Sequence, residues 1–345
     1  MIDLSPYANA LYEYCTYPAV RYNLLLRILG LPEQDARVVS LKKEFLTSDI
    51  ADEMAETQDR RGGWGHLVSK DYSVKAKIPT SSVGISRCLY IGLTLDDRDI
   101  LFDANEYLEG LLAGRVQEQI FEKNERARPW TEAMICGHLE SIAKTAGRTN
   151  PLCDEVIAKW QYIASRAYED GEYSHERDKA AQQELFYTHE DRLIPMQSGL
   201  ILSRRDGISR DTEDAMLRHL GGHAASHGHF WDKTVYSMPQ SFRSDKTRRW
   251  MATFEYINQF RGSSLYLSDA VEWLLSQADE RGLWDWGTQT KDPWGYFRYF
   301  SLNRKYALNR TVDCTMEILF FLKQYNENNS IQSSCYSCAK SPDTD

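Results

Sequence analysis

Apolar residues recur every three or four positions along most of the chain, whereas strict apolar–polar alternation is scarce. Two clear examples are YPAVRYNLLLRILGL at residues 17–31 and TEAMICGHLESIAKTAG at residues 131–147. A period of three to four residues is typical of a helix with a buried face, and alternation is typical of a strand. The pattern therefore predicts an all-α protein.

Two kinds of helix alternate along this pattern. One kind is apolar on almost every side, which indicates burial all round. The other kind is amphipathic, as in residues 35–56 and 266–276. Most helices of the first kind open on Pro or on a Ser/Thr cap, as helix N-termini prefer. Their six expected starts lie near Pro18, Thr80, Trp130, Pro195, Arg248 and Thr311.

Six buried helices alternating with amphipathic ones predict an (α/α)6 toroid, in which an inner and an outer ring of helices surround a central cavity. The helix expected at residues 5–15 would supply the last outer element. No linker rich in Pro or Gly interrupts the period, so we expect one domain over residues 1–325. Residues 326–345 are polar and are expected to form a disordered tail, in which the pair Cys335 and Cys338 is a weak metal signal.

Composition narrows the class of protein further. The chain has 345 residues, a hydrophobic fraction of 42% and a net charge of −9. No block of Lys and Arg is present, so nucleic-acid binding is not expected. The first residues lack the pattern of a signal peptide, and no apolar run approaches the roughly 18 residues of a spanning helix. We therefore expect a cytoplasmic protein, and seven scattered cysteines do not indicate a disulfide framework.

Two turn sequences share Gln, Gly and Trp. TQDRRGGWGH contains Gln58 and Trp64, and SQADERGLWDWG contains Gln277 and Trp284, with one residue more between its Gln and its Gly. Weaker copies lie around Gly171 and Gly228, at intervals of about 55 residues. The structural interpretation is that Gly makes the turn, the Gln amide ties neighbouring hairpins together and Trp packs over the seam. The tryptophans are then staples, not catalytic groups.

These turns resemble the QW repeats of the terpenoid cyclase and protein prenyltransferase superfamily, which includes squalene–hopene cyclase. The chain is most similar to bacterial single-toroid, squalene-cyclase-like proteins. The resemblance implies that the starts of the inner helices surround the mouth of the cavity. Asp313 and Cys314 open the sixth inner helix in TVDCT, where squalene–hopene-type cyclases have a D-x-D-D-T-A stretch with a protonating Asp. Cys314 stands where the last Asp would be, and Thr311 replaces the first.

Each of these two candidate catalytic residues has a structural alternative. A protonating Asp313 needs a raised pKa, whereas a helix N-terminus favours the carboxylate. Asp313 would otherwise be a cap or first-turn acid that stabilises the helix. Cys314 would be a nucleophile, a metal ligand or a packed core residue.

No cofactor or metal is predicted. Protein prenyltransferases have a zinc site, and this sequence does not contain its full set of ligands. Neither the D-x-C spacing nor a His at a matching helix start is present. Four histidines of one outer segment have either a surface role or a metal-binding role: His219, His223, His227 and His229.

Other candidate substrate-binding residues follow from matching helix starts and from the ring-rich segment before the sixth inner helix. Aromatic faces stabilise cations and also stack on sugars, and an arginine in that segment could hold a diphosphate. The candidates are Trp130, Glu132, Gln197, Trp250, Trp294, Tyr296, Phe297, Tyr299 and Arg298.

Three functions compete. The first is a terpenoid-cyclase-like enzyme, an isomerase or lyase, that binds an isoprenoid or other apolar small molecule and cyclises it by protonation. The second is a toroid without catalysis that binds a lipid or a peptide of a protein partner. The third is a carbohydrate-processing enzyme, which would need a second carboxylate near Asp313, such as Glu132 or Glu255.

Overall fold

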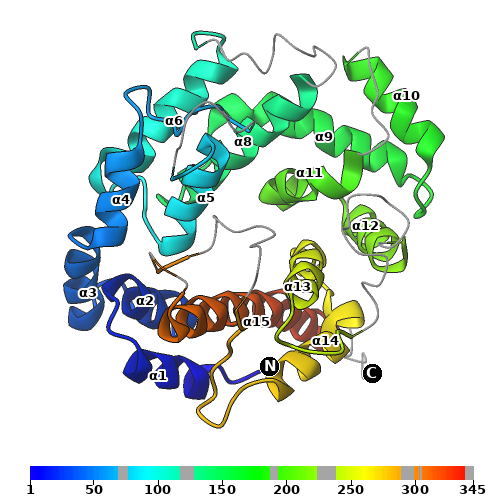
Figure 1. Ribbon diagram of the computed structural model, residues 1–345. Helices are drawn as coiled ribbons and strands as arrows, with labels where there is room; N and C mark the ends of the chain where they lie inside the picture. Colours follow the sequence, from blue (N-terminus) through cyan, green and yellow to red (C-terminus); the bar gives the residue numbers. More distant parts are fainter. Residues whose placement is uncertain are drawn as a thin grey trace, which may run out of the picture.

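The computed structural model describes residues 1–68, 77–116, 128–186, 193–223, 238–288, 299–301, 303 and 305–338. Throughout these ranges the regular structure is helical and no strand occurs, so the all-α prediction is confirmed (Figure 1). The α-helices are α1 (Ser5–Tyr14), α2 (Pro18–Asn23), α3 (Ala36–Leu46), α4 (Asp49–Thr57), α5 (Ser81–Ile91), α6 (Arg98–Leu112), α8 (Arg128–Lys144), α9 (Asp154–Ala167), α10 (His175–Phe186), α11 (Leu193–Ile201), α12 (Arg210–His223), α13 (Asp245–Ile257), α14 (Ser264–Ser276) and α15 (Ala307–Cys338).

Six helices follow one another around the inside of the molecule. Helix α2 continues into the π-helical turn η1 (Leu24–Ile28), and contacts then run from α2 to α5, α8, α11 and α13 in succession. The Asn258 side chain at the end of α13 donates to the Phe321 carbonyl of α15 at 2.8 Å, and α15 contacts η1. The remaining helices lie mostly outside this series (Figure 1). All six inner helices begin within about one turn of the starts predicted from the sequence.

The N-terminal helix joins the two ends of this series. Helix α1 packs against both α15 and η1. The backbone of Ile2 is held by the Asn326 amide, which accepts from its N–H at 2.9 Å and donates to its carbonyl at 2.8 Å. The ring of Tyr7 lies 5.0 Å from that of Trp284. The chain thereby closes on itself.

The two best turn copies have the same backbone geometry. In the first, Gly62 donates to the Asp59 carbonyl at 3.0 Å; in the second, Gly282 donates to the Asp279 carbonyl at 2.8 Å. Both glycines have a positive φ, +88° and +80°, which side chains disfavour. Each Asp also accepts from the backbone N–H two residues later. The shared pattern is therefore D-x-R-G-x-W, which adds an Asp to the residues predicted from the sequence.

Tryptophan plays the predicted stapling part in both copies. The Trp64 and Trp284 side chains are 2% and 1% exposed. The backbone N–H of Trp64 donates to Ser81 Oγ of α5 at 2.9 Å, and that of Trp284 donates to Thr315 Oγ1 of α15 at 3.0 Å. Each turn is thus attached to an inner helix.

The glutamines differ between the copies. Gln58 Nε2 donates to the carbonyls of Gly62 and of Ile100 in α6, both at 2.8 Å, and so ties neighbouring hairpins. Gln277 Nε2 instead reaches only the neighbouring Ser276 Oγ at 2.9 Å. The prediction for Gln277 is wrong, because the additional residue in its turn moves the amide away from the next hairpin.

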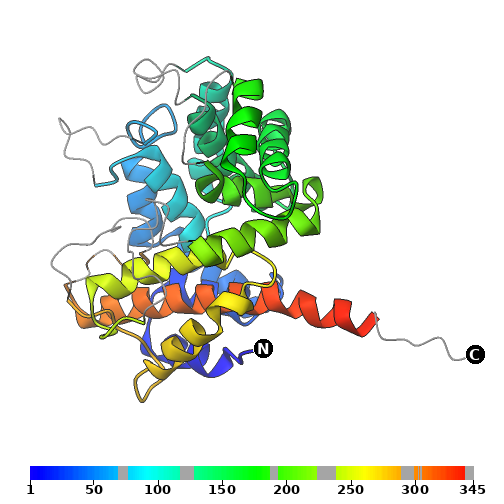
Figure 2. The same cartoon turned by 90° about the vertical axis from the view of Figure 1, so that its right-hand side faces the viewer.

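The last helix continues past residue 325, where the end of the domain was expected. Helix α15 runs on to Cys338 and extends beyond the body of the molecule (Figure 2). Polar side chains in its later turns bind other parts of the chain: Asn326 holds Ile2, and Asn328 donates to the Asn258 carbonyl. Polar composition here serves contacts to backbone, so it does not indicate disorder. Of the expected tail, residues 339–345 lie outside the described part.

Among the described helices, none is both long and apolar enough to cross a membrane.

Candidate ligand-binding cavity

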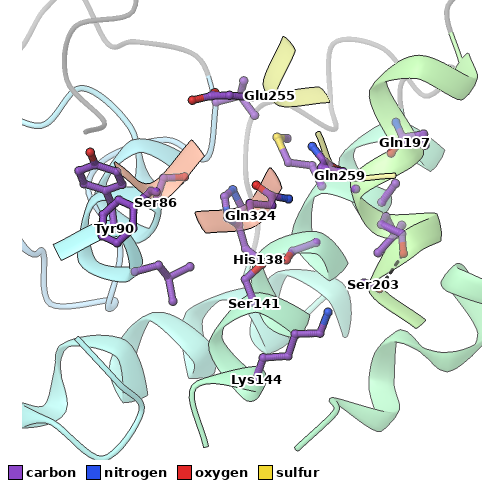
Figure 3. Close-up of a pocket in the computed structure, with 18 of the residues that line it drawn as sticks. Ser86, Tyr90, His138, Ser141, Lys144, Gln197, Ser203, Glu255, Gln259 and Gln324 are labelled. Carbon is purple, nitrogen blue, oxygen red and sulfur yellow. Dashed lines mark hydrogen bonds between the residues drawn. The ribbon is translucent and has the colours of Figure 1, made fainter. Parts of the chain in front are cut away.

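A cavity of about 1040 Å³ lies between the inner helices (Figure 3). Every inner helix contributes to its wall. Arg27 comes from η1, Glu255 from α13, and the largest share comes from α8. Such a volume is at the upper end of the range for small-molecule sites.

The wall residues repeat with the period of a helix. On α15 they are Glu317, Phe320, Phe321 and Gln324, which share one face because residues three, four and seven apart do so. Helix α8 shows the same spacing along its whole length: Trp130, Ala133, Met134, Gly137, His138, Ser141 and Lys144. The cavity is therefore lined along the helices and not only at their starts.

Three glutamine amides from different elements face the cavity (Figure 3). Gln197 belongs to α11, Gln259 follows the end of α13, and Gln324 belongs to α15. The Gln197 side chain is only 5% exposed. Within the described part of the chain, none of the three side-chain amides has a hydrogen-bond partner.

Three charged side chains of the wall have interactions of their own. Arg27 Nη1 donates to Asn23 Oδ1 and to the Tyr90 carbonyl, both at 3.0 Å, and its guanidinium lies 4.1 Å from the Phe320 ring centre. Burial lowers the pKa of Arg27. Glu255 and Glu317 each have an interaction within the protein as well.

His138 is a neutral group on this wall. Its Nε2 lies 2.8 Å from Ser82 Oγ, across the contact between α8 and α5. Desolvation lowers its pKa to about 4, so the imidazole is uncharged at neutral pH.

Replacing His138 with glutamine is expected to flatten the loss of stability in acid. The folded-state pKa lies below the ordinary value of 6.5, so between these two values the unfolded chain binds the proton and the folded chain does not. Stability that is complete above pH 6.5 is lost as the pH falls toward 4. At 1.36 kcal/mol per pKa unit, wild type should lose about 1–3 kcal/mol more than His138→Gln. Urea unfolding at pH 7 and pH 4.5 measures this difference, and equal losses would contradict it.

Asp313 does not line the cavity. Its side chain is 0% exposed, and Oδ1 accepts from the backbone N–H groups of Phe300 at 2.8 Å and Ser301 at 3.2 Å. Oδ2 accepts from Ser301 Oγ at 2.6 Å. Helix α15 begins at Ala307, so Asp313 is not an N-cap or a first-turn acid either. It ties residues 300–301 to the helix.

Two other predicted site residues belong to the packed core. Cys314 is 0% exposed and does not contribute to the cavity wall. Trp250 is 3% exposed and makes edge-to-face contacts with Phe254 at 4.6 Å and with Trp273 at 5.1 Å between ring centres. Their helices are buried on several sides, and these positions face neighbouring helices.

Trp130 and Gln197 are the predicted residues that the structure brings to the cavity wall. Glu132 instead pairs with Arg128, with 2.9 Å between Oε1 and Nε, and Tyr299 is buried outside the wall. Four predicted residues lie outside the described part of the chain: Trp294, Tyr296, Phe297 and Arg298.

The histidine segment does not form a described metal site. His219 lies against Tyr173, with 4.4 Å between ring centres. His227 and His229 fall outside the described residues. In the ranges that the structure describes, no group of three His, Cys, Asp or Glu side chains is placed to hold a metal ion.

Several wall residues were not predicted because they lie away from the helix starts. Glu317 follows Asp313 by four residues, and Gln324 lies two turns beyond Glu317 on the same helix; both are polar residues in an apolar helix. The available signal was the recurrence of polar residues at helical spacing within α8 and α15.

Fold and site together define an all-α protein with one large, mixed polar and aromatic cavity between its inner helices. Comparison of the chain with protein-family models, with curated proteins and with solved structures gave no match. The resemblance to the terpenoid cyclase superfamily therefore stays a prediction.

Proposed function

We propose that the chain is an (α/α)6 toroid whose function is to bind an organic ligand in its central cavity. The observation that carries this proposal is the cavity of about 1040 Å³, to which all six inner helices contribute. The succession of contacts from α2 to α15, and the closure by α1, support the toroid. A concave site with a few convergent polar groups is typical of ligand binding.

The surroundings of Asp313 favour a binding function over a catalytic one. A Brønsted acid must reach the substrate and hold its proton. Asp313 is buried away from the wall, and the donors at Phe300 and Ser301 favour the ionised carboxylate. The toroid can therefore act without this residue in a chemical role.

Isoprenoid cyclisation is the second candidate function. It is favoured by ring faces on the wall, from Tyr90, Trp130 and Phe320, because aromatic faces stabilise carbocations. In this version the acid would be Glu317, which is 4% exposed and lies one turn beyond Asp313 on the wall.

Gly137 offers a direct test. It lies on the wall within α8, and a Cβ atom added there would meet no other atom within 4 Å. Gly137→Trp should fill the cavity, whereas Gly137→Ala should leave it open and stabilise the helix by about 0.5–1 kcal/mol.

The measurement is the thermal midpoint with saccharides, isoprenoid diphosphates, squalene and short peptides. A ligand at about 100 times its Kd contributes roughly 2.7 kcal/mol. We expect a ligand that raises the midpoint of wild type and of Gly137→Ala but not of Gly137→Trp. A shift that persists in Gly137→Trp, or no shift with any compound, would contradict the proposal.

A further inference from the structure

We infer that the cavity ligand is an uncharged, hydroxyl-rich molecule, an oligosaccharide, held by the side-chain amides of Gln197, Gln259 and Gln324. This inference rests on the proposed function and names its ligand class.

The amides carry the argument. Each amide has an acceptor oxygen and two donor hydrogens, and those of the three glutamines have no partner within the described part of the chain. The Gln197 side chain is only 5% exposed, and its amide opens onto the cavity. Polar groups that are withdrawn from water are normally hydrogen-bonded. A ligand that both donates and accepts at each contact would satisfy all three.

Hydroxyl groups match this requirement. Each hydroxyl donates once and accepts twice, so a sugar ring presents alternating donors and acceptors to the three amides. The hydroxyl of Ser86 on α5 likewise has no hydrogen-bond partner among the described residues. A hydrocarbon ligand would instead cover these groups without forming hydrogen bonds to them, which is unfavourable.

The charges of the wall argue against an anionic ligand. The guanidinium of Arg27 is engaged with two carbonyl-type acceptors and with the Phe320 ring. Lys144 is the last residue of α8, and the partial negative charge of a helix C-terminus opposes an anion there. Glu255 and Glu317 repel one. Among the described residues of this wall, a diphosphate therefore finds no cluster of cations.

The aromatic residues complete the match. The side chains of Tyr90 and Trp130 are half-buried on the wall. Aromatic faces carry negative potential, which attracts the weakly positive C–H groups on the face of a sugar ring. A saccharide can therefore bind the amides through its hydroxyl groups and the aromatic rings through the C–H face of its ring.

Calorimetric titration with neutral linear saccharides tests this inference. The probes are the tri- to hexasaccharides of glucose, of galactose and of N-acetylglucosamine; farnesyl diphosphate, squalene and a neutral hexapeptide are the comparison arms. We expect a saccharide to bind wild type and Gly137→Ala. Gln197→Leu and Gln259→Leu should each weaken its binding at least tenfold, and the turn variant Gln277→Leu should not. Circular dichroism confirms that each variant is folded.

The two proposals fail in different ways. If farnesyl diphosphate, squalene or the peptide binds and Gly137→Trp blocks it, while no saccharide binds, the ligand class is wrong and the cavity function stands. If a saccharide binds equally well to Gly137→Trp, both proposals are wrong about the site. If no saccharide binds, the oligosaccharide inference is overturned.

Discussion

Replacing Asp313 with alanine should lower the free energy of unfolding by about 3–5 kcal/mol, as loss of one partner in a buried charged network does. The carboxylate is completely buried and accepts from Phe300 N–H, Ser301 N–H and Ser301 Oγ. Its removal leaves these donors without an acceptor, at about 1–3 kcal/mol for each that stays buried. Urea unfolding monitored by circular dichroism at pH 7 measures the loss.

A graded series separates this structural role from the catalytic one. Ser301→Ala removes a single bond to Oδ2 and should cost about 1 kcal/mol. Asp313→Asn keeps one acceptor oxygen and should fall between Ser301→Ala and Asp313→Ala. If Asp313→Asn instead abolished turnover of an isoprenoid at unchanged stability, the carboxylate would be an acid and the structural account would be wrong.

The second large effect is expected for Trp284→Ala, at about 3–5 kcal/mol of lost stability, because a large buried ring leaves a cavity. Trp284 is 1% exposed, its ring lies 5.0 Å from that of Tyr7, and its Nε1 donates to the Leu274 carbonyl at 2.7 Å. It therefore joins α1, α14 and the turn before α15. Thermal unfolding in parallel with wild type gives the comparison.

Two variants isolate the causes. Trp284→Phe keeps most of the packing and loses the bond to Leu274, so it should cost less than Trp284→Ala. Trp130→Ala removes a ring that lines the cavity and is only half-buried, so it should affect ligand binding more than stability. Equal destabilisation by Trp284→Ala and Trp130→Ala would contradict the distinction between a stapling and a cavity-lining tryptophan.

Local sequence located the secondary structure well but located the site only in part. The starts of the inner helices were predictable because apolar spacing and helix caps are local signals. Trp130 and Gln197 were found at the wall because they lie near such starts. Glu317, Gln259 and Gln324 were not, because the choice of helix starts came from a resemblance and not from the face that each helix presents.

The role of Asp313 could not be predicted from its position in the sequence either. An acidic residue early in a buried helix has several possible partners, and sequence position does not choose between them. The loop at Phe300 and Ser301 turns its N–H groups toward the carboxylate, and this contact spans more than a helical turn of intervening chain. Likewise, Asn326 and Asn328 are typical of a polar tail in the sequence. In the structure Asn326 binds Ile2, and Asn328 binds Asn258.

The sequence by itself determined that the protein is helical, where its six inner helices begin, and which glycines and tryptophans make its turns. These features depend on neighbours within a few residues, where helical period, capping and positive φ act. Only the tertiary structure decided which face of each helix meets the cavity, because rotation of a helix about its axis depends on how distant helices pack against it. That packing brings Asp313 against the backbone of residues 300–301, and it places three glutamine amides on the cavity wall.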